Sequence, residues 1–283
     1  MLVHATVEKM TAMHLTAMVE AFQRQLASPQ FADLCFEDRV GMLVDQEWTA
    51  REQRKLQRRL QSANLRHQAS LEDIDWQAPR RGLDKALVGS LATCAWIQQH
   101  QNLVIIGPTG IGKSWLADAF AERACRAGYS AYRVRIPRLL HDLAVARGDG
   151  SYIRLLAKLA KTALLVLDDW GLAPLTGLQR HDILEVLEDR TERASTLITS
   201  QLPIKAWHEA IGEPTLADSI CDRLVHTAHV LDLQGPSLRD PKVRSPRSHP
   251  DPGPAESERA PTPSAGSARK EAKRPAPAPK HGA

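Results

Sequence analysis

The segment from Gly107 to Ser114, GPTGIGKS, constrains the fold of this 283-residue chain more than any other feature. It follows the pattern G-x-x-x-x-G-K-S/T, in which glycines let consecutive backbone N–H groups point inward at phosphate oxygens. A short apolar run at 101–107 predicts a buried strand before this loop, and residues 113–127 predict a helix after it. The order of strand, glycine-rich loop and helix predicts a site for a nucleoside triphosphate.

The loop side chains have separate expected roles in holding ATP. Lys113 is expected to reach the β- and γ-phosphates, where it also serves catalysis, and the hydroxyl of Ser114 is expected to ligate Mg²⁺. ATP and Mg²⁺ are therefore the expected cofactors. The remaining expected nucleotide contacts are Gly107, Pro108, Thr109, Gly110, Ile111, Gly112 and Trp115.

A second apolar run, LLVLDD at 164–169, ends in two acids about 55 residues after the loop. An ATPase of this type needs a carboxylate at the end of a neighbouring strand to hold the metal shell, and Asp168 is placed for that role. Asp169 is the candidate for orienting or activating the attacking water. Many related ATPases have Glu at the position of Asp169. Because Asp is one methylene shorter, we expect it to hold the attacking water less well and turnover to be slow.

Strand and helix patterns alternate through residues 71–240. Further strands are predicted at 129–136, 195–200 and 229–234, and helices at 137–147, 151–161 and 177–193. This alternation predicts an α/β fold with a parallel sheet flanked by helices. Residues 1–70 predict a small all-helical domain, since apolar residues recur there at three- and four-residue steps. Residues 241–283 hold ten of the eighteen prolines and nine Lys/Arg against four Asp/Glu, which predicts a disordered basic tail.

Polar residues near the C-terminal end of the ATPase region are candidates for sensing hydrolysis. The strand at 195–200 ends in the polar cluster Thr199-Ser200-Gln201. Ser200 or Gln201 would lie between the two acids and the γ-phosphate, unless the cluster simply ends the strand. Arg223 is the candidate for an arginine offered to a neighbouring subunit's nucleotide, and Arg239 for one acting in its own subunit. Surface salt bridges are the alternative for either arginine.

Two groups of basic residues are candidates for contacting DNA phosphates. Solvated helix faces are the alternative explanation for both groups. The first group is Arg51, Lys55, Arg58 and Arg59, and the second is Arg138, Arg154 and Lys158.

The four cysteines are not paired in C-x-x-C motifs, and no apolar run approaches the roughly 20 residues of a membrane helix. The N-terminus lacks the pattern of a signal peptide. We therefore expect a cytoplasmic protein with no membrane partner.

Several stretches together resemble the IstB-type helper ATPases of insertion-sequence transposition, relatives of the DnaC-type helicase loaders in the AAA+ superfamily. The resemblance implies an AAA+ P-loop core behind a helical N-terminal domain, self-assembly through the ATP interface on double-stranded DNA, and recruitment or stimulation of a cognate transposase. It also implies that Arg223 acts across the interface and that Arg239 is a second sensor. The matching stretches are residues 71–76, 101–117, 164–172, 195–203 and 219–239.

Two other functions share much of this pattern. A DnaC-like replicative helicase loader would have the same ATPase core and a different partner. A non-enzymatic module would use ATP only as a ligand switch. A metabolic kinase is a weaker alternative, because no acceptor-binding lid is apparent.

Overall fold

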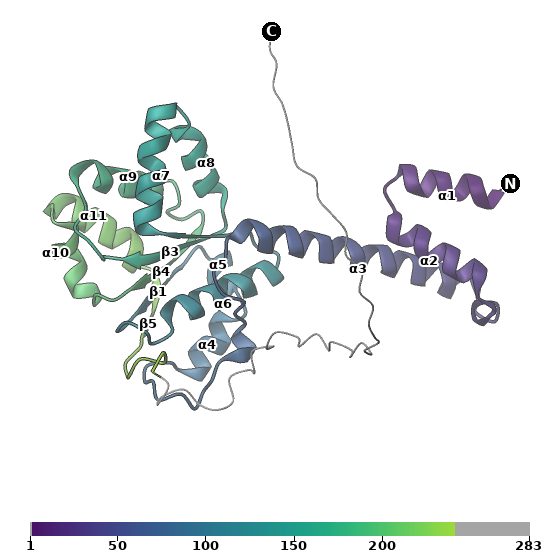
Figure 1. The fold of residues 1–283 in the computed structure, drawn as a ribbon, viewed down its shortest axis with the longest axis horizontal. Coiled ribbons are helices and arrows are strands. Elements are labelled where there is room, and N and C mark those ends of the chain that lie inside the picture. Colours follow the sequence, from purple (N-terminus) through teal and green to yellow (C-terminus); the bar gives the residue numbers. More distant parts are fainter. Residues whose placement is uncertain (1, 241–283) are drawn as a thin grey trace, which may run out of the picture. The chain divides into compact units, whose positions relative to one another are not determined.

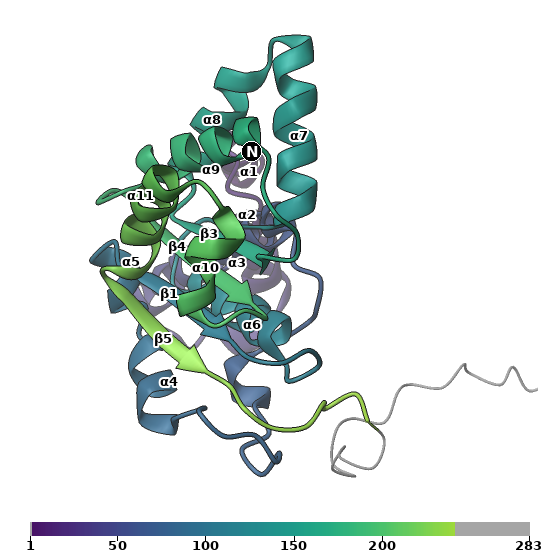
Figure 2. The same cartoon turned by 90° about the vertical axis from the view of Figure 1, so that its left-hand side faces the viewer.

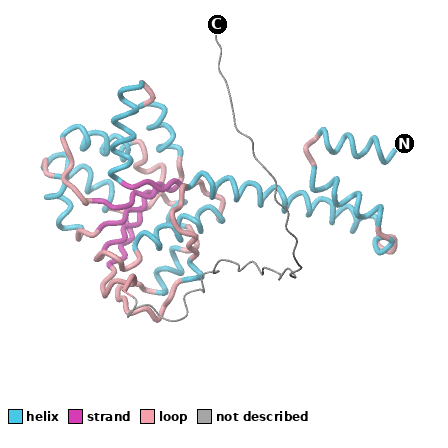
Figure 3. The backbone as a smooth tube through the Cα atoms, in the orientation of Figure 1, coloured by secondary structure: helices cyan, strands magenta, loops and turns pink. Residues whose placement is uncertain are grey.

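A computed structural model describes residues 2–240 of the chain, and the predicted tail at 241–283 lies outside the described residues. The centre of the fold is a five-stranded parallel sheet, drawn in magenta in Figure 3. Its strand order is β2-β3-β4-β1-β5. All five predicted strands are present, so the predicted α/β fold with a parallel sheet is confirmed. The strands are β1 (Asn102–Ile106), β2 (Ala131–Arg135), β3 (Leu164–Trp170), β4 (Ser195–Ser200) and β5 (Ala228–Asp232).

Helices cover both faces of the sheet, as Figure 1 and the rotated view in Figure 2 show. Consecutive residues of β1 point to opposite faces, so Leu103 and Ile105 enter one core while Val104 and Ile106 enter the other. The first core packs against α4 (Lys85–Leu91), α5 (Ala95–Gln98) and α6 (Lys113–Arg126). The second packs against α7 (Ile136–Asp149), α8 (Tyr152–Lys161), α9 (Gly177–Glu188), α10 (Trp207–Ile211) and α11 (Pro214–Val225).

The N-terminal part of the chain is helical, as predicted, with α1 (Leu2–Ala12), α2 (Thr16–Ala27) and α3 (Phe36–Ala63). Glu47 of α3 is 4% exposed and accepts hydrogen bonds from the backbone N–H groups of Ala17 and Met18 at 3.0 and 3.1 Å. A buried carboxylate therefore satisfies free N–H groups in the first turn of α2. None of the helices at 2–240 has the length and apolarity needed to cross a bilayer.

The last turns of α3 contact the sheet domain directly. The Arg59 guanidinium donates to the carbonyl of Cys125 at 2.8 Å, and the Asn64 amide donates to the carbonyl of Arg133 at 3.0 Å. Asn64 ends α3 in the left-handed conformation, with φ of 55°, which suits Asn better than most residues. The division of the chain near residue 70 stays a prediction, and α3 reaches α6 and β2 before that point.

Candidate functional site

The predicted phosphate loop joins β1 to α6, and its glycines adopt the geometry that the motif requires. Gly107, Gly110 and Gly112 all have positive φ. A Cβ atom on Gly110 would lie 2.1 Å from the hydroxyl of Ser237, so only glycine fits there. The backbone N–H of Leu238 donates to the carbonyl of Gly110 at 3.0 Å. The segment after β5 therefore packs against the loop, although it is more than 120 residues away in sequence.

The Lys113 side chain lies within the loop and is 9% exposed. Its ammonium group donates to the carbonyls of Gly107 and Pro108 at 2.8 and 2.9 Å. Burial lowers the pKa of Lys113, and the nearby charges of Asp169 and Asp168 oppose that shift. The cation is therefore held against the loop's own carbonyls at the wall of the pocket.

Asp168 is 1% exposed and lies beside Ser114, which lines the pocket, without lining the pocket itself. Its Oδ1 accepts hydrogen bonds from the hydroxyls of Ser114, at 2.9 Å, and of Thr199. Its Oδ2 accepts from the Nη2 of Arg133. Ser114 and Asp168 together offer hard oxygen ligands, which is the donor set that Mg²⁺ takes beside phosphate and water. These two residues therefore fit the expected metal.

Asp169 lies at an irregularity of the sheet. Leu167 pairs with Ile198 and Trp170 pairs with Ser200, so two residues of β3 face only Thr199 of β4. Such a bulge bends the strand and redirects a side chain. Asp169 takes φ of 64°, its N–H donates to the Thr199 hydroxyl at 3.2 Å, and its carboxylate lies in the pocket with Arg135 Nε at 2.6 Å. Sequence reasoning placed the acid and singled out the polar cluster that contains Thr199, but it did not predict the bulge.

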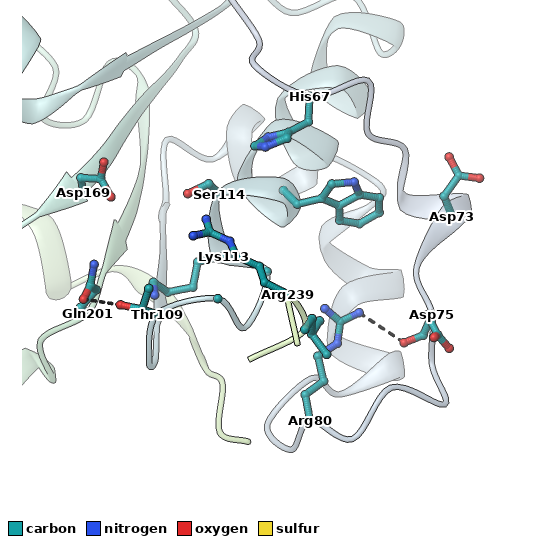
Figure 4. A pocket seen from close by; sticks show the side chains of 14 residues that line it. His67, Asp73, Asp75, Arg80, Thr109, Lys113, Ser114, Asp169, Gln201 and Arg239 are labelled. Atoms are coloured by element: carbon teal, nitrogen blue, oxygen red, sulfur yellow. Dashed lines mark hydrogen bonds between the residues drawn. The ribbon is translucent and has the colours of Figure 1, made fainter. Parts of the chain in front are cut away.

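The loop, Asp169 and the C-terminal segment enclose a pocket of about 340 Å³, shown in Figure 4. Four of its lining side chains come from the segment between α3 and α4 and were not predicted as site residues, although Asp73 and Asp75 lie in the stretch at 71–76 that carries the family resemblance. Among these, His67 contacts Asp118 through its backbone N–H and its ring, and the Arg80 Nη2 donates to the carbonyl of Asp75 at 3.3 Å. The lining residues are His67, Asp73, Asp75, Arg80, Thr109, Gly110, Gly112, Lys113, Ser114, Trp115, Asp169, Gln201, Leu238 and Arg239.

The two candidates at the end of β4 have different surroundings. Gln201 lines the pocket and accepts a hydrogen bond from the Thr109 hydroxyl of the phosphate loop at 2.6 Å. Ser200 is fully buried, donates to the carbonyl of Trp170 at 2.9 Å and does not line the pocket. Of the two, Gln201 is the side chain that lines the pocket.

The two candidate arginines lie at opposite ends of the sheet. Arg239 lines the pocket, and its charge acts on Lys113. Arg223 lies in the last turn of α11, where its carbonyl accepts from Asn102 at the start of β1 and its guanidinium pairs with Glu188 at 2.9 Å. A parallel strand of five residues spans roughly 16 Å. Arg223 is therefore separated from its own chain's phosphate loop by the length of β1.

Of the predicted DNA-contacting residues of α3, three already form ion pairs or hydrogen bonds within the protein. Arg51 pairs with Glu47 and Lys55 with Glu52, both at 2.8 Å. Arg59 docks α3 on α6, which leaves its guanidinium less available than a solvated one. Arg58 is exposed.

The candidates on α7 and α8 have different surroundings, because those on α8 line a separate pocket and Arg138 on α7 does not. Arg138 pairs with Asp142 at 2.9 Å and is 69% exposed. Arg154 and Lys158 line this pocket, and the Lys158 ammonium lies 4.3 Å from the centre of the Tyr132 ring. No contact with DNA is tested by these observations, so both groups stay predictions.

Comparison with known proteins shows that the chain belongs to one family. Residues 8–245 match the family model described as IstB-like ATP binding protein. The insertion sequence ATP-binding protein y4pL of Sinorhizobium fredii is 52% identical over 239 residues, which cover 84% of this chain and 97% of that protein. The IS1162 ATP-binding protein of Pseudomonas fluorescens is 45% identical over 72% of this chain and 88% of its own. The IS21 ATP-binding protein of Pseudomonas aeruginosa is 32% identical over 80% of this chain and 84% of its own.

Solved structures of similar fold include DnaI and the DnaC helicase loader. DnaI is 22% identical, with a TM-score of 0.49, over 59% of this chain and 91% of its own. DnaC is 18% identical, with a TM-score of 0.46, over 62% of this chain and 98% of its own.

Proposed function

This chain belongs to the family of IstB-like ATP-binding proteins, and on that premise we propose that it is an ATP-hydrolysing helper protein of insertion-sequence transposition. It acts in the cytoplasm, assembles on duplex DNA with ATP, and recruits or stimulates a partner transposase at the target site. Hydrolysis resets the assembly. The relatives support this reading, because they are named as ATP-binding proteins of insertion sequences.

The hydrogen bond between Ser114 and Asp168 is the observation that carries the hydrolytic part of the proposal. It joins the start of α6 to the end of β3, so the loop that grips phosphate and the acid that would hold Mg²⁺ form one unit. Mg²⁺, when bound there, would neutralise charge on the β- and γ-phosphates. A glycine-rich turn without catalytic purpose would not need a buried carboxylate beside its first helical hydroxyl.

Different residues of this chain have different roles in the proposed hydrolysis. The loop amides and Lys113 hold the phosphates, and Arg239 adds positive charge to the same pocket. Asp169 orients the attacking water, and Gln201 reports the γ-phosphate through its contact with Thr109. Arg223 of one subunit stabilises charge on the nucleotide of the next subunit.

The surface of α3 supports the proposed binding of macromolecular partners. Phe36, Val40, Val44 and Trp48 are all exposed and recur at four-residue steps, which makes one apolar ridge. Arg51, Lys55 and Arg58 continue the same helix beyond this ridge. An exposed apolar ridge beside basic residues suits contact with both a protein and DNA phosphates.

The decisive experiment measures phosphate release with and without duplex DNA at low salt. We expect slow release by the protein alone, faster release with DNA, and ATP-dependent DNA binding that weakens steeply as salt rises. Lys113→Ala is the control, and it should lower ATP affinity at least about tenfold, because it removes the only ammonium that the described loop offers to the phosphates. The absence of both DNA stimulation and ATP-dependent DNA binding would refute the transposition-helper proposal.

The partner distinguishes a transposition helper from a helicase loader. Pull-down of the purified protein with a candidate partner transposase and, separately, with a replicative helicase should retain the transposase only. Retention of the helicase alone would replace the proposal with the loader function.

A further inference from the structure

A buried chain of charged side chains connects Asp168 to the linker at 64–70, which follows α3. Asp118 lies on α6 one turn after Ser114 and is fully buried. Its Oδ2 accepts a hydrogen bond from the backbone N–H of His67 at 3.0 Å, and the Nδ1 of His67 lies 2.6 Å from the same oxygen. Arg133 of β2 is 5% exposed and lies between Asp118 and Asp168.

Arg133 is shared unequally between these two carboxylates. Its Nη2 makes a hydrogen bond with Asp168. Its Nε lies 3.1 Å from Asp118 Oδ1, but neither of these two buried atoms has a hydrogen-bond partner, so the contact is electrostatic without the alignment of a hydrogen bond. A buried polar atom that lacks a hydrogen bond is costly. A second arrangement, in which the Arg133 Nε aligns with Asp118, would give both of these atoms a hydrogen bond.

A change in which carboxylate Arg133 bonds would reach α3 through the linker at 64–70. Asn64, which ends α3, donates to the backbone carbonyl of the same Arg133. His67 lines the nucleotide pocket, as Figure 4 shows, and holds Asp118 from the other side. A shift of the Arg133 guanidinium thus reaches both the end of α3 and the wall of the pocket.

We propose that Arg133 and Asp118 form a coupling device that transmits the binding of Mg·ATP to the linker at 64–70. The inference rests on the proposed function, since it takes Asp168 as the metal-binding carboxylate. When Asp168 shares its negative charge with the metal, its attraction for Arg133 weakens. Arg133 then aligns with Asp118, and Asp118 loosens its hold on His67. Arg133 and Asp118 are positioning residues, because neither touches the reacting atoms.

Two variants should shift the Mg²⁺ affinity of the ATP complex in opposite directions. Asp118→Asn removes the charge that draws Arg133 away, so Arg133 stays on Asp168 and the Mg²⁺ half-saturation concentration should rise about tenfold. His67→Ala removes the imidazole that competes for Asp118 and keeps the backbone N–H contact, so that concentration should fall about threefold. The measurement is a titration of Mg²⁺ into the full chain with a fluorescent ATP analogue, referred to analogue binding in EDTA.

Opposite changes in the Mg²⁺ half-saturation concentration distinguish coupling from a general loss of structure, because a loss of structure would weaken metal binding in both variants. His67 has a side chain that is 36% exposed, so His67→Ala should fold even if the Asp118 variant does not. Glu72→Gln is the matched control. It breaks another contact between the linker region and α6, the Glu72–Arg126 pair at 3.2 Å, which does not lead to Asp168. Its Mg²⁺ titration should equal that of the wild type.

Hydrogen–deuterium exchange of the linker tests the same device without reference to activity. The amide of His67 should exchange faster with Mg·ATP than with ATP in EDTA, and Asp118→Asn should abolish that difference. Shifts of equal sign in both variants, or unchanged exchange while Mg²⁺ and ATP bind, would overturn the coupling alone. A wild-type chain that binds no ATP would instead overturn the proposed function, and this inference with it.

Discussion

At the scale of single residues, the backbone of Asp169 is the most unusual feature of the site. It is a non-glycine residue at φ of 64° in a strand bulge, and its N–H is held by Thr199. Such a conformation costs about 1–3 kcal/mol and persists only where neighbours enforce it. Here it separates two adjacent acids, so that Asp168 is buried against Ser114 while Asp169 faces the pocket.

This separation predicts that Asp169→Asn divides binding from hydrolysis. The amide keeps the size of the side chain but removes the base that orients water, so phosphate release should fall about 100-fold or more. ATP affinity should stay within about twofold, because Lys113 and the loop amides are untouched. Single-turnover phosphate release and equilibrium ATP binding measure the two effects.

Asp142→Asn, which changes a surface acid on α7, is the matched control and should leave both values unchanged. Turnover by Asp169→Asn close to that of the wild type would show that another group activates the water.

At the scale of elements, one buried arginine fastens α8, α9 and β4 to each other. Arg190 follows α9, is 1% exposed, and donates to the carbonyls of Leu159, Thr162 and Ser195 and to the Thr196 hydroxyl. Burial lowers its pKa to about 10, a value at which the side chain is still charged near neutral pH. Arg190 lies just beyond the end of α9 at Glu188, which is five residues before the end that the sequence predicted for this helix.

We therefore expect Arg190→Ala to destabilise the protein by about 3 kcal/mol or more, since it leaves several buried carbonyls without donors. Chemical denaturation measures the free energy of unfolding. Arg193→Ala, on the exposed turn that follows, is the control and should change it by less than about 0.5 kcal/mol. Equal effects of the two substitutions would mean that the buried bonds contribute little.

At the scale of the whole molecule, the two halves of the proposed catalytic machinery face away from each other. The phosphate loop and both acids lie at the C-terminal ends of β1 and β3, whereas Arg223 lies beside the N-terminal end of β1. One chain cannot bring both to one nucleotide without unfolding the sheet. Full activity is therefore expected only when subunits stack end to end.

This arrangement predicts complementation between two inactive variants. Lys113→Ala is expected to bind ATP weakly and Arg223→Ala cannot offer the arginine, so each alone should hydrolyse ATP poorly. A mixture should regain part of the activity, because a Lys113→Ala subunit can offer its intact Arg223 to the nucleotide of an Arg223→Ala neighbour. ATP hydrolysis by equimolar mixtures, measured over a range of total protein concentration, tests this.

Activity of the mixture no higher than the sum of its parts would place Arg223 outside the reaction. Full activity of Arg223→Ala alone would do the same.

Local patterns in the sequence determined the strands, the phosphate loop and the acids at 168–169. Buried parallel strands are continuous apolar runs, and a phosphate cradle is built from eight consecutive residues, so both are encoded locally. The tertiary structure decided what meets at the site. Asp118, Arg133 and His67 come together because β2 pairs with β3 and the linker crosses α6. Strand order and the packing of distant segments leave no periodic signal in the chain, and contacts over 35 to 54 residues follow from them alone.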